Sequence, residues 1–305
     1  MKKYLALLLA FAMIFSMVGC GSKGSDKGSD VVVKIGGKDF TEQLILAQLT
    51  VQLLESNGIK AEDKSNVAGS DTCRKALEAG EFGLYWEYTG TAWSMLLQES
   101  GEMSTDPKEL FDAVKAADEA NDMVWLNYAP MNNTYALVMP EALSSELGIT
   151  SYTELGEYIT ANPGALVLAC DHEFTAREDG LPGLVATYGT DFGDSLKTME
   201  MGIVYQTLGA GQADVGMVFA TDGRIKANNL ILLKDDKNFF PVYNGAPCVR
   251  KDILEAHPKI EELLGKLAAL LTDEVMQDLN YMVDGDNLEP SEVAAKFLKD
   301  QGLVS

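Results

Sequence analysis

The stretch Val31-Val-Val-Lys-Ile-Gly-Gly37 sets the class of fold, because a short β-rich run ends there at two glycines. It predicts a strand with a turn after it. Residues 41–57 then carry apolar side chains at the spacing of a largely buried amphipathic helix, and Gly58 suits the end of that helix. A strand, a turn and a helix in succession are typical of proteins in which helices pack on sheets.

The same order recurs along the chain. Ser70 and Asp71 are expected to cap a helix over 72–79, and Pro107 is well placed near the start of a helix that runs to about 120. The segment 253–303 is predicted to be mainly helical. Further strands are predicted over 82–88, 123–127, 134–139, 165–169, 215–220 and 230–233. The whole pattern predicts an α/β protein.

The first twenty residues indicate export. Lys2 and Lys3 precede an apolar run, to about residue 17, that is too short to span a bilayer comfortably. Met17-Val-Gly-Cys20 resembles a bacterial lipobox, which implies a lipoprotein signal peptide over 1–19 and a diacylglycerol on the Cys20 thiol. An ordinary signal peptide with an incidental cysteine is the alternative. Residues 20–30 are predicted to form a flexible tether, so we expect a lipid-anchored domain on the extracytoplasmic face of the membrane.

Charge and cysteine content exclude several classes of partner. The chain has 46 acidic and 24 basic residues, a formal net charge of −22, which argues against nucleic acid and anionic lipid. Besides Cys20 there are Cys73, Cys170 and Cys248, so at least one is unpaired, and whether two of them bridge stays open. With two histidines and no Cys/His cluster, we expect no metal site, and no cofactor motif is present.

Six short segments occur in a familiar order and at familiar distances. They are Gly37-Lys-Asp-Phe-Thr-Glu-Gln43, Leu84-Tyr-Trp-Glu-Tyr-Thr-Gly-Thr91, Asn132-Asn-Thr-Tyr-Ala-Leu137, Glu173-Phe-Thr-Ala-Arg-Glu-Asp-Gly180, Phe219-Ala-Thr-Asp-Gly223 and Phe239-Phe-Pro-Val-Tyr-Asn-Gly-Ala-Pro247. Together they resemble the glycine betaine/carnitine/choline-binding proteins of osmoprotectant ABC importers, over residues 31–305. The resemblance implies a two-lobed, periplasmic-binding-protein-like fold of type 2 with a ligand cleft between the lobes. Lobe one would comprise 31–131 plus 245–305, and lobe two 135–242.

A trimethylammonium group carries a charge but no N–H donor, so aromatic faces recognise it through their quadrupole. The carboxylate of a betaine instead needs cationic or hydroxyl donors. The resemblance implies a site with both parts. The aromatic cage would be Tyr88, Tyr135, Phe219 and Tyr243, the carboxylate donors Lys38, Thr91 and Arg177, and the carbonyl of Asn133 would face the methyl groups. The family usually has Tyr at the position of Phe219 and often Asp at that of Asn133.

Taken one at a time, these residues have simpler interpretations. Tyr88, Tyr135 and Phe219 would pack in the core, Lys38 and Arg177 would be solvated surface charges, and Thr91 would cap a helix from about residue 92. Tyr243, which lies in a loop flanked by Pro and Gly, is about evenly balanced between a core and a site residue. Tyr85 and Trp86 are interpreted as packing, and Tyr128 as a second-choice cage residue.

The sequence therefore predicts an extracytoplasmic substrate-binding protein that captures a quaternary-ammonium osmolyte, glycine betaine first, and delivers it to an ABC permease. An enzyme with Glu42 and Glu87 as an acid/base pair is the competing class, but a position in the first turn of a helix explains Glu42. No nucleophile, phosphate-loop or metal motif supports catalysis. A third option is an amino-acid-binding protein, which would need an acidic acceptor that none of the assigned positions supplies.

Overall fold

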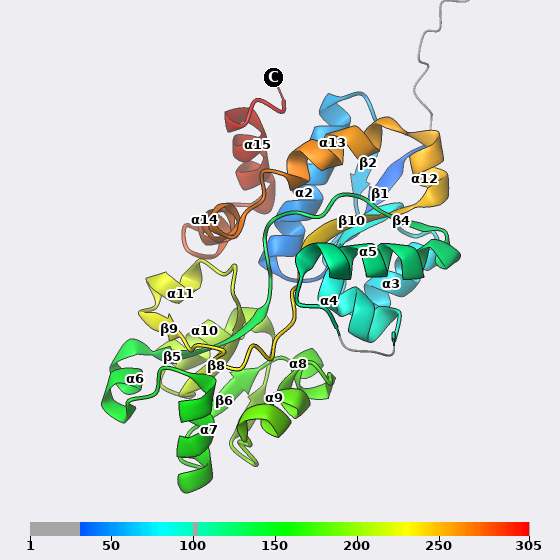
Figure 1. Cartoon of the computed structure of the whole chain (residues 1–305). Helices are drawn as coiled ribbons and strands as arrows, with labels where there is room; N and C mark the ends of the chain where they lie inside the picture. Colours follow the sequence, from blue (N-terminus) through cyan, green and yellow to red (C-terminus); the bar gives the residue numbers. More distant parts are fainter. Residues whose placement is uncertain (1–30, 100–102, 305) are drawn as a thin grey trace, which may run out of the picture.

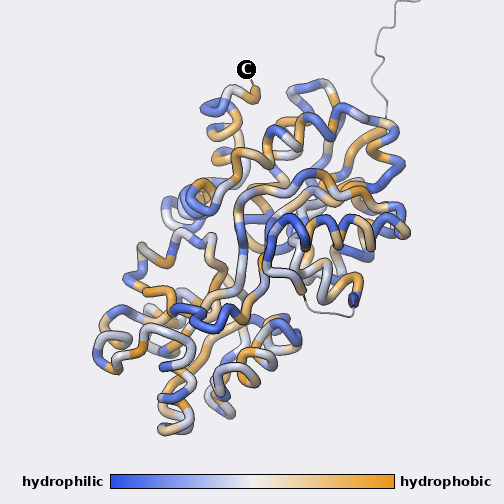
Figure 2. Tube along the Cα trace, in the orientation of Figure 1, coloured by the Kyte–Doolittle hydropathy of each residue, from blue (hydrophilic) through white to orange (hydrophobic). Residues whose placement is uncertain are grey.

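The computed structural model describes residues 31–99 and 103–304, and within them the chain forms two five-stranded sheets covered by helices (Figure 1). The strand order is β2-β1-β3-β10-β4 in the first sheet and β7-β6-β8-β5-β9 in the second. The predicted α/β architecture with two lobes is thus confirmed. Hydrophilic and hydrophobic residues alternate along the outer helices, as expected for helices that bury one face (Figure 2).

The first sheet combines parallel and antiparallel pairs. Strand β1 pairs in parallel with β2 and β3, whereas β10 lies antiparallel between β3 and β4. The chain therefore returns to this sheet after building the second one. The strands are β1 Val33–Ile35, β2 Ala61–Asp63, β3 Leu84–Tyr88, β4 Met123–Trp125 and β10 Gly245–Arg250.

Helix α2 forms the centre of the lobe around the first sheet. It is buried on most of its surface, since it contacts β2 and β3 as well as helices α13, α14 and α15. The helical elements of this lobe are α2 Thr41–Ser56, α3 Ser70–Glu78, α4 Thr89–Thr91, the π-helical turn η1 Ala92–Leu96, α5 Pro107–Asp118, the 3-10 turn η2 Glu119–Asn121, α12 Lys251–Ala256, α13 Lys259–Ala268, α14 Asp273–Asp284 and α15 Pro290–Asp300.

The second sheet repeats the mixed arrangement. Strand β5 lies antiparallel between β8 and β9, and β6 pairs in parallel with β7 and β8. Its strands are β5 Tyr135–Pro140, β6 Leu168–Cys170, β7 Leu196–Thr198, β8 Val215–Phe219 and β9 Leu230–Leu232. Its helices are α6 Glu141–Leu147, α7 Tyr152–Ala161, α8 His172–Ala176, α9 Leu181–Tyr188, α10 Met201–Gly209 and α11 Arg224–Ala227.

Two crossovers join the sheets, residues 126–134 and 233–244 (Figure 1). They are held together by an antiparallel bridge between Asn132 and Asn244. The amide of Tyr243 donates to Oδ1 of Asn132 at 2.7 Å, and the amide of Asn133 donates to the carbonyl of Tyr243 at 3.1 Å. A pair of bonded crossovers is a suitable hinge. The precise lobe boundaries stay a prediction.

Some local predictions were wrong. Helix α3 begins at Ser70, its cap residue is Gly69, and no side chain caps it, so neither Ser70 nor Asp71 has the expected role. Thr91 lies inside a helical turn and does not cap the segment after it. The strands β2, β7 and β10 were missed, the last because a proline in a central strand argues against a strand.

The three described cysteines are free and buried, which settles the question of their pairing. Within 31–99 and 103–304, no helix has the length and apolar character needed to span a bilayer. The signal peptide, Cys20 and the tether lie outside the described residues.

Candidate ligand-binding site

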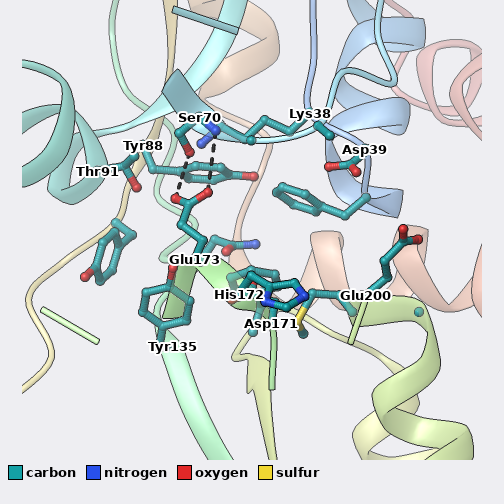
Figure 3. Close-up of a pocket in the computed structure, with 18 of the residues that line it drawn as sticks. Lys38, Asp39, Ser70, Tyr88, Thr91, Tyr135, Asp171, His172, Glu173 and Glu200 are labelled. Carbon is teal, nitrogen blue, oxygen red and sulfur yellow. Dashed lines mark hydrogen bonds between the residues drawn. The ribbon is translucent and has the colours of Figure 1, made fainter. Parts of the chain in front are cut away.

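A cavity of about 500 Å³ lies between the two lobes and is lined by residues from both (Figure 3). Seven of the eight predicted ligand-binding residues line it, and the exception is Arg177. Within the described part of the chain, no group of side chains is arranged to hold a metal ion.

The four predicted cage residues come together because they lie where strands and crossovers meet. Tyr88 ends β3, and Tyr135 is the register partner of Phe219 across the antiparallel pair of β5 and β8. The Tyr135 ring centroid lies 5.6 Å from that of Phe219 and 5.7 Å from that of Tyr243, which the second crossover supplies. The structure thus gathers all four predicted aromatics around one space.

A fifth aromatic residue, Phe40, was missed. Its ring stacks on Phe219 at 5.2 Å and on Tyr88 at 6.4 Å, and it lines the cavity. The sequence signal that could have identified Phe40 as a cavity residue was its position between Lys38 and the helix that follows. Tyr128, the second-choice cage residue, packs on Phe111 in a separate hydrophobic cluster and does not line the cavity.

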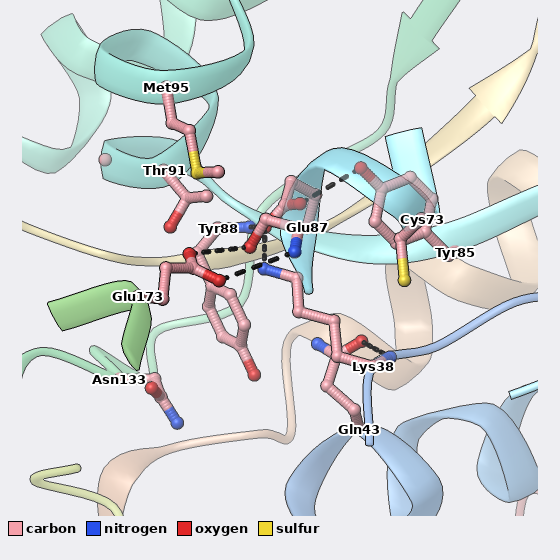
Figure 4. A network of polar contacts seen from close by, with 12 residues as sticks. Lys38, Gln43, Cys73, Tyr85, Glu87, Tyr88, Thr91, Met95, Asn133 and Glu173 are labelled. Carbon is pink, nitrogen blue, oxygen red and sulfur yellow. Dashed lines mark hydrogen bonds and ion pairs between the residues drawn. The ribbon is translucent and has the colours of Figure 1, made fainter. Parts of the chain in front are cut away.

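Lys38 is buried and paired with a carboxylate of the same lobe (Figure 4). It is 5% exposed, and its Nζ lies 2.6 Å from Oε1 of Glu87, which is 0% exposed. Glu87 also accepts from the hydroxyl of Tyr85 at 3.0 Å and the amide of Tyr88 at 2.7 Å. Lys38 is therefore a buried counter-ion, not a solvated surface charge.

Arg177 lies at the edge of the cage and joins the two lobes. Its guanidinium donates to both oxygens of Asp179, at 2.7 and 2.6 Å, and to Oε1 of Glu173 at 3.0 Å. It also donates to the hydroxyl oxygens of Thr91 at 3.3 Å and Ser94 at 3.2 Å, both in the first lobe. At 7% exposed, it is not a surface charge either.

Glu173 crosses the cavity from the second lobe to the first, and sequence reasoning did not assign it (Figure 3). Its carboxylate accepts from the hydroxyl of Ser70 at 3.0 Å and from the Ser70 amide at 3.5 Å. Burial disfavours its ionised form, but the charges of Lys38 and Arg177 and the bond from Ser70 hold its pKa below the usual value. Glu173 therefore places a negative charge in the ligand space.

Other acidic side chains also line the cavity, among them Asp39, Asp171 and Glu200. The argument against an amino-acid ligand, that no assigned position is acidic, therefore does not hold for the whole cavity. Burial raises the pKa of Asp171 from 3.8 to about 6, against the opposing effect of the bond from the Phe174 amide.

This shift gives a test of stability against pH. Asp171 binds its proton more tightly in the folded state than in the unfolded state. Its contribution to the free energy of unfolding is therefore largest below about pH 4 and is lost as pH rises towards 6. The variant Asp171→Asn can still cap α8. Relative to wild type, its free energy of unfolding should rise by about 2 kcal/mol between pH 4 and pH 6. Urea unfolding at pH 4 and pH 7 measures it, and equal differences at both pH values would contradict it.

The proposed acid/base pair is not assembled. Glu87 is neutralised by Lys38, whereas Glu42 accepts from the hydroxyl of Tyr88 and from the side chains of Asn133 and Asn280. The two carboxylates therefore have different main partners, although Tyr88 contacts both, Glu87 through its amide and Glu42 through its hydroxyl.

Comparisons with known proteins point to one family. A family model described as the substrate binding domain of ABC-type glycine betaine transport systems matches residues 31–300. A protein of Pseudomonas aeruginosa named glycine-betaine-binding protein is 40% identical over 89% of this chain and 88% of its own length. The glycine betaine-binding protein YehZ of Escherichia coli is 31% identical, over 88% and 90%.

Among solved structures, a crystal structure of a glycine betaine/carnitine/choline ABC transporter superposes with a TM-score of 0.73 at 30% identity. The match covers 89% of this chain and 99% of that one. The chain belongs to the family of substrate-binding domains of ABC-type glycine betaine transport systems.

Proposed function

We propose that this substrate-binding protein captures glycine betaine in the cavity between its lobes and presents it to the permease of an ABC importer. The observation that carries the proposal is the cluster of aromatic rings around Tyr135. Rings from the second sheet and from the second crossover meet there and line the same cavity. Each face contributes roughly 0.5–2 kcal/mol to binding a quaternary ammonium. Four or five faces supply a large share of the roughly 8 kcal/mol of micromolar binding.

The carboxylate of the ligand would bind to Lys38, Thr91 and Arg177, with the carbonyl of Asn133 towards the methyl groups. Glu173 accepts from Arg177 at 3.0 Å, so the carboxylate of the ligand would compete with Glu173 for this guanidinium.

Choline is the nearest competitor. Choline has no carboxylate for Lys38 and Arg177, but both are already paired with carboxylates of the chain, so choline would leave neither cation unpaired. Support for glycine betaine comes instead from the relative in Pseudomonas aeruginosa that is named for it.

The variant Glu173→Gln should affect the binding of glycine betaine and of choline in opposite directions. It removes a like charge that faces the carboxylate of glycine betaine and a counter-charge that attracts choline, so the affinity ratio should move towards glycine betaine by about 1–2 kcal/mol. Competition titration by calorimetry measures the ratio. A ratio equal to that of wild type would show that Glu173 does not face the bound carboxylate.

The cage is tested by truncation. We expect Tyr88→Ala to weaken glycine betaine binding by roughly 1–2 kcal/mol or more, and Tyr88→Phe to cost less, because the ring quadrupole attracts most of the charge. Calorimetry gives both values, and wild-type affinity in the alanine variant would remove Tyr88 from the cage.

An amino acid is the second candidate ligand, since Asp171 and Glu173 could accept from a primary ammonium. A thermal-shift screen with glycine betaine, carnitine, choline, proline and arginine distinguishes the candidates. Stabilisation by arginine or proline, with none by the quaternary ammonium compounds, would favour the amino-acid reading.

We further propose that the chain is not an enzyme and that a lipid on Cys20 holds it on the extracytoplasmic face of the membrane. The tether then keeps it near the permease at high effective concentration. Cys20→Ala should release the protein into the soluble fraction, which fractionation and immunoblotting would show.

A further inference from the structure

Glu42 is a buried carboxylate directly behind the cage. It lies in the first turn of α2 and is 2% exposed. Its Oε1 accepts from the hydroxyl of Tyr88 at 2.7 Å and from Nδ2 of Asn133 at 2.7 Å. Its Oε2 accepts from Nδ2 of Asn280 at 3.1 Å. The donors come from β3, the first crossover and α14, so three separate elements fix the position of this carboxylate.

Glu42 differs from the other buried acids near the cage because no cation is paired with it in the described part of the chain. Glu87 has Lys38 as its counter-ion, and Asp179 has Arg177. The partners of Glu42 are neutral donors. Two of them are side-chain amide nitrogens, which only donate, and they reach different oxygens of Glu42. Burial raises the pKa of this carboxyl, and these bonds act against that rise by stabilising its ionised form.

The two cage tyrosines provide a comparison within one site. The hydroxyl of Tyr88 donates to Glu42, and the hydroxyl of Tyr243 donates to Asp179 at 2.8 Å. Because Arg177 offsets the charge of Asp179, only the first of these two tyrosines is bonded to an uncompensated carboxylate.

A phenol that donates to a carboxylate has a more electron-rich ring, which makes its face more attractive to a cation. The charge of the carboxylate itself also acts strongly in a buried site, where screening by water is weak. Both effects favour a cationic ligand and give little to a neutral group of the same shape.

We propose that Glu42 is a specificity-determining residue that acts through Tyr88 and makes the cage select a quaternary ammonium over its uncharged isostere. This inference rests on the proposed function of the same cavity. It assigns charge selectivity to a residue that does not itself supply an aromatic face.

The test compares two ligands of equal shape in full-length protein. Glycine betaine is measured against tert-butylacetate, in which carbon replaces the quaternary nitrogen, by calorimetry and by ligand-detected NMR for weak binding. We expect Glu42→Gln to lower the affinity for glycine betaine by roughly fivefold to tenfold and that for tert-butylacetate by less than about twofold. Glu55→Gln, the same change at an exposed position of α2, should leave both unchanged.

A glutamine at position 42 turns an amide towards the asparagine donors, so folding of this variant must be checked by thermal unfolding. Tyr88→Phe and Tyr243→Phe are the second test, because each keeps its ring. The affinity ratio of glycine betaine to tert-butylacetate should fall about threefold in the first and stay close to wild type in the second.

The outcomes are distinct. If Glu42→Gln lowers both affinities equally, or if the two phenylalanine variants change the ratio equally, Glu42 only supports the structure and the inference is wrong. If wild-type protein does not prefer glycine betaine to tert-butylacetate, the proposed function itself fails.

Discussion

Replacing Lys38 with methionine is expected to lower the free energy of unfolding by about 3–5 kcal/mol, because it leaves the Glu87 carboxylate buried without its counter-ion. Glu87 is 0% exposed, and its remaining partners, Tyr85 and the Tyr88 amide, are neutral donors. These bonds cannot offset the lost solvation of a full charge.

The double variant Lys38→Met/Glu87→Gln is the matched control. Removing both charges eliminates the unpaired ion, so most of the lost stability should return. Urea denaturation of the wild type, both single variants and the double variant measures the coupling between them. A double variant no more stable than Lys38→Met would show that the ion pair is not the cause.

Arg177→Ala should weaken glycine betaine binding by about 3 kcal/mol or more, roughly a hundredfold, because it acts on closure as well as on the ligand. The guanidinium joins Glu173 and Asp179 to Thr91 and Ser94 in the other lobe. Without it, Glu173 and Asp179 lose this cation, and the bonds from the guanidinium to the other lobe are lost.

Two measurements check this prediction. Calorimetry gives the affinity, and small-angle scattering gives the decrease in radius of gyration when glycine betaine is added. Compaction should be smaller in Arg177→Ala than in wild type. Arg250→Ala removes an arginine that pairs with Asp252 at the surface of the first lobe, and it should leave both values unchanged. Full compaction in Arg177→Ala would contradict a role in closure.

The sequence predicted the elements that bear the cage because the residues involved lie at strand ends. Tyr88, Tyr135 and Phe219 each stand where an apolar run meets a loop, and alternation along the chain makes such places visible. The helix over 41–57 was predicted within one residue of its observed end for a similar reason, since its apolar spacing is regular. Resemblance to the family supplied the roles that we propose for these residues.

The charges of the site could not be predicted in the same way. Glu173 and Ser70 are 103 residues apart, and their bond exists only because one lobe faces the other. The pairing of Lys38 with Glu87 depends likewise on how the segment after β1 crosses the end of β3. The spacing of apolar residues along the sequence reveals a helix or a strand. Ion pairs depend instead on how separate elements lie relative to one another in the folded chain.

The late position of β10 in the sequence affects the order in which the two lobes can fold. Strand β10 is an inner strand of the first sheet, between β3 and β4, yet it is formed by 245–250, after the whole of the second sheet. A chain that emerges from its N-terminus therefore has β3 and β4 long before the strand that joins them. The second sheet, by contrast, is made from one continuous segment and needs no later residues. The order of strands thus keeps the first lobe incomplete until residues 245–250 are available. Such a delay would suit the proposed export, if the chain crosses the membrane before it folds.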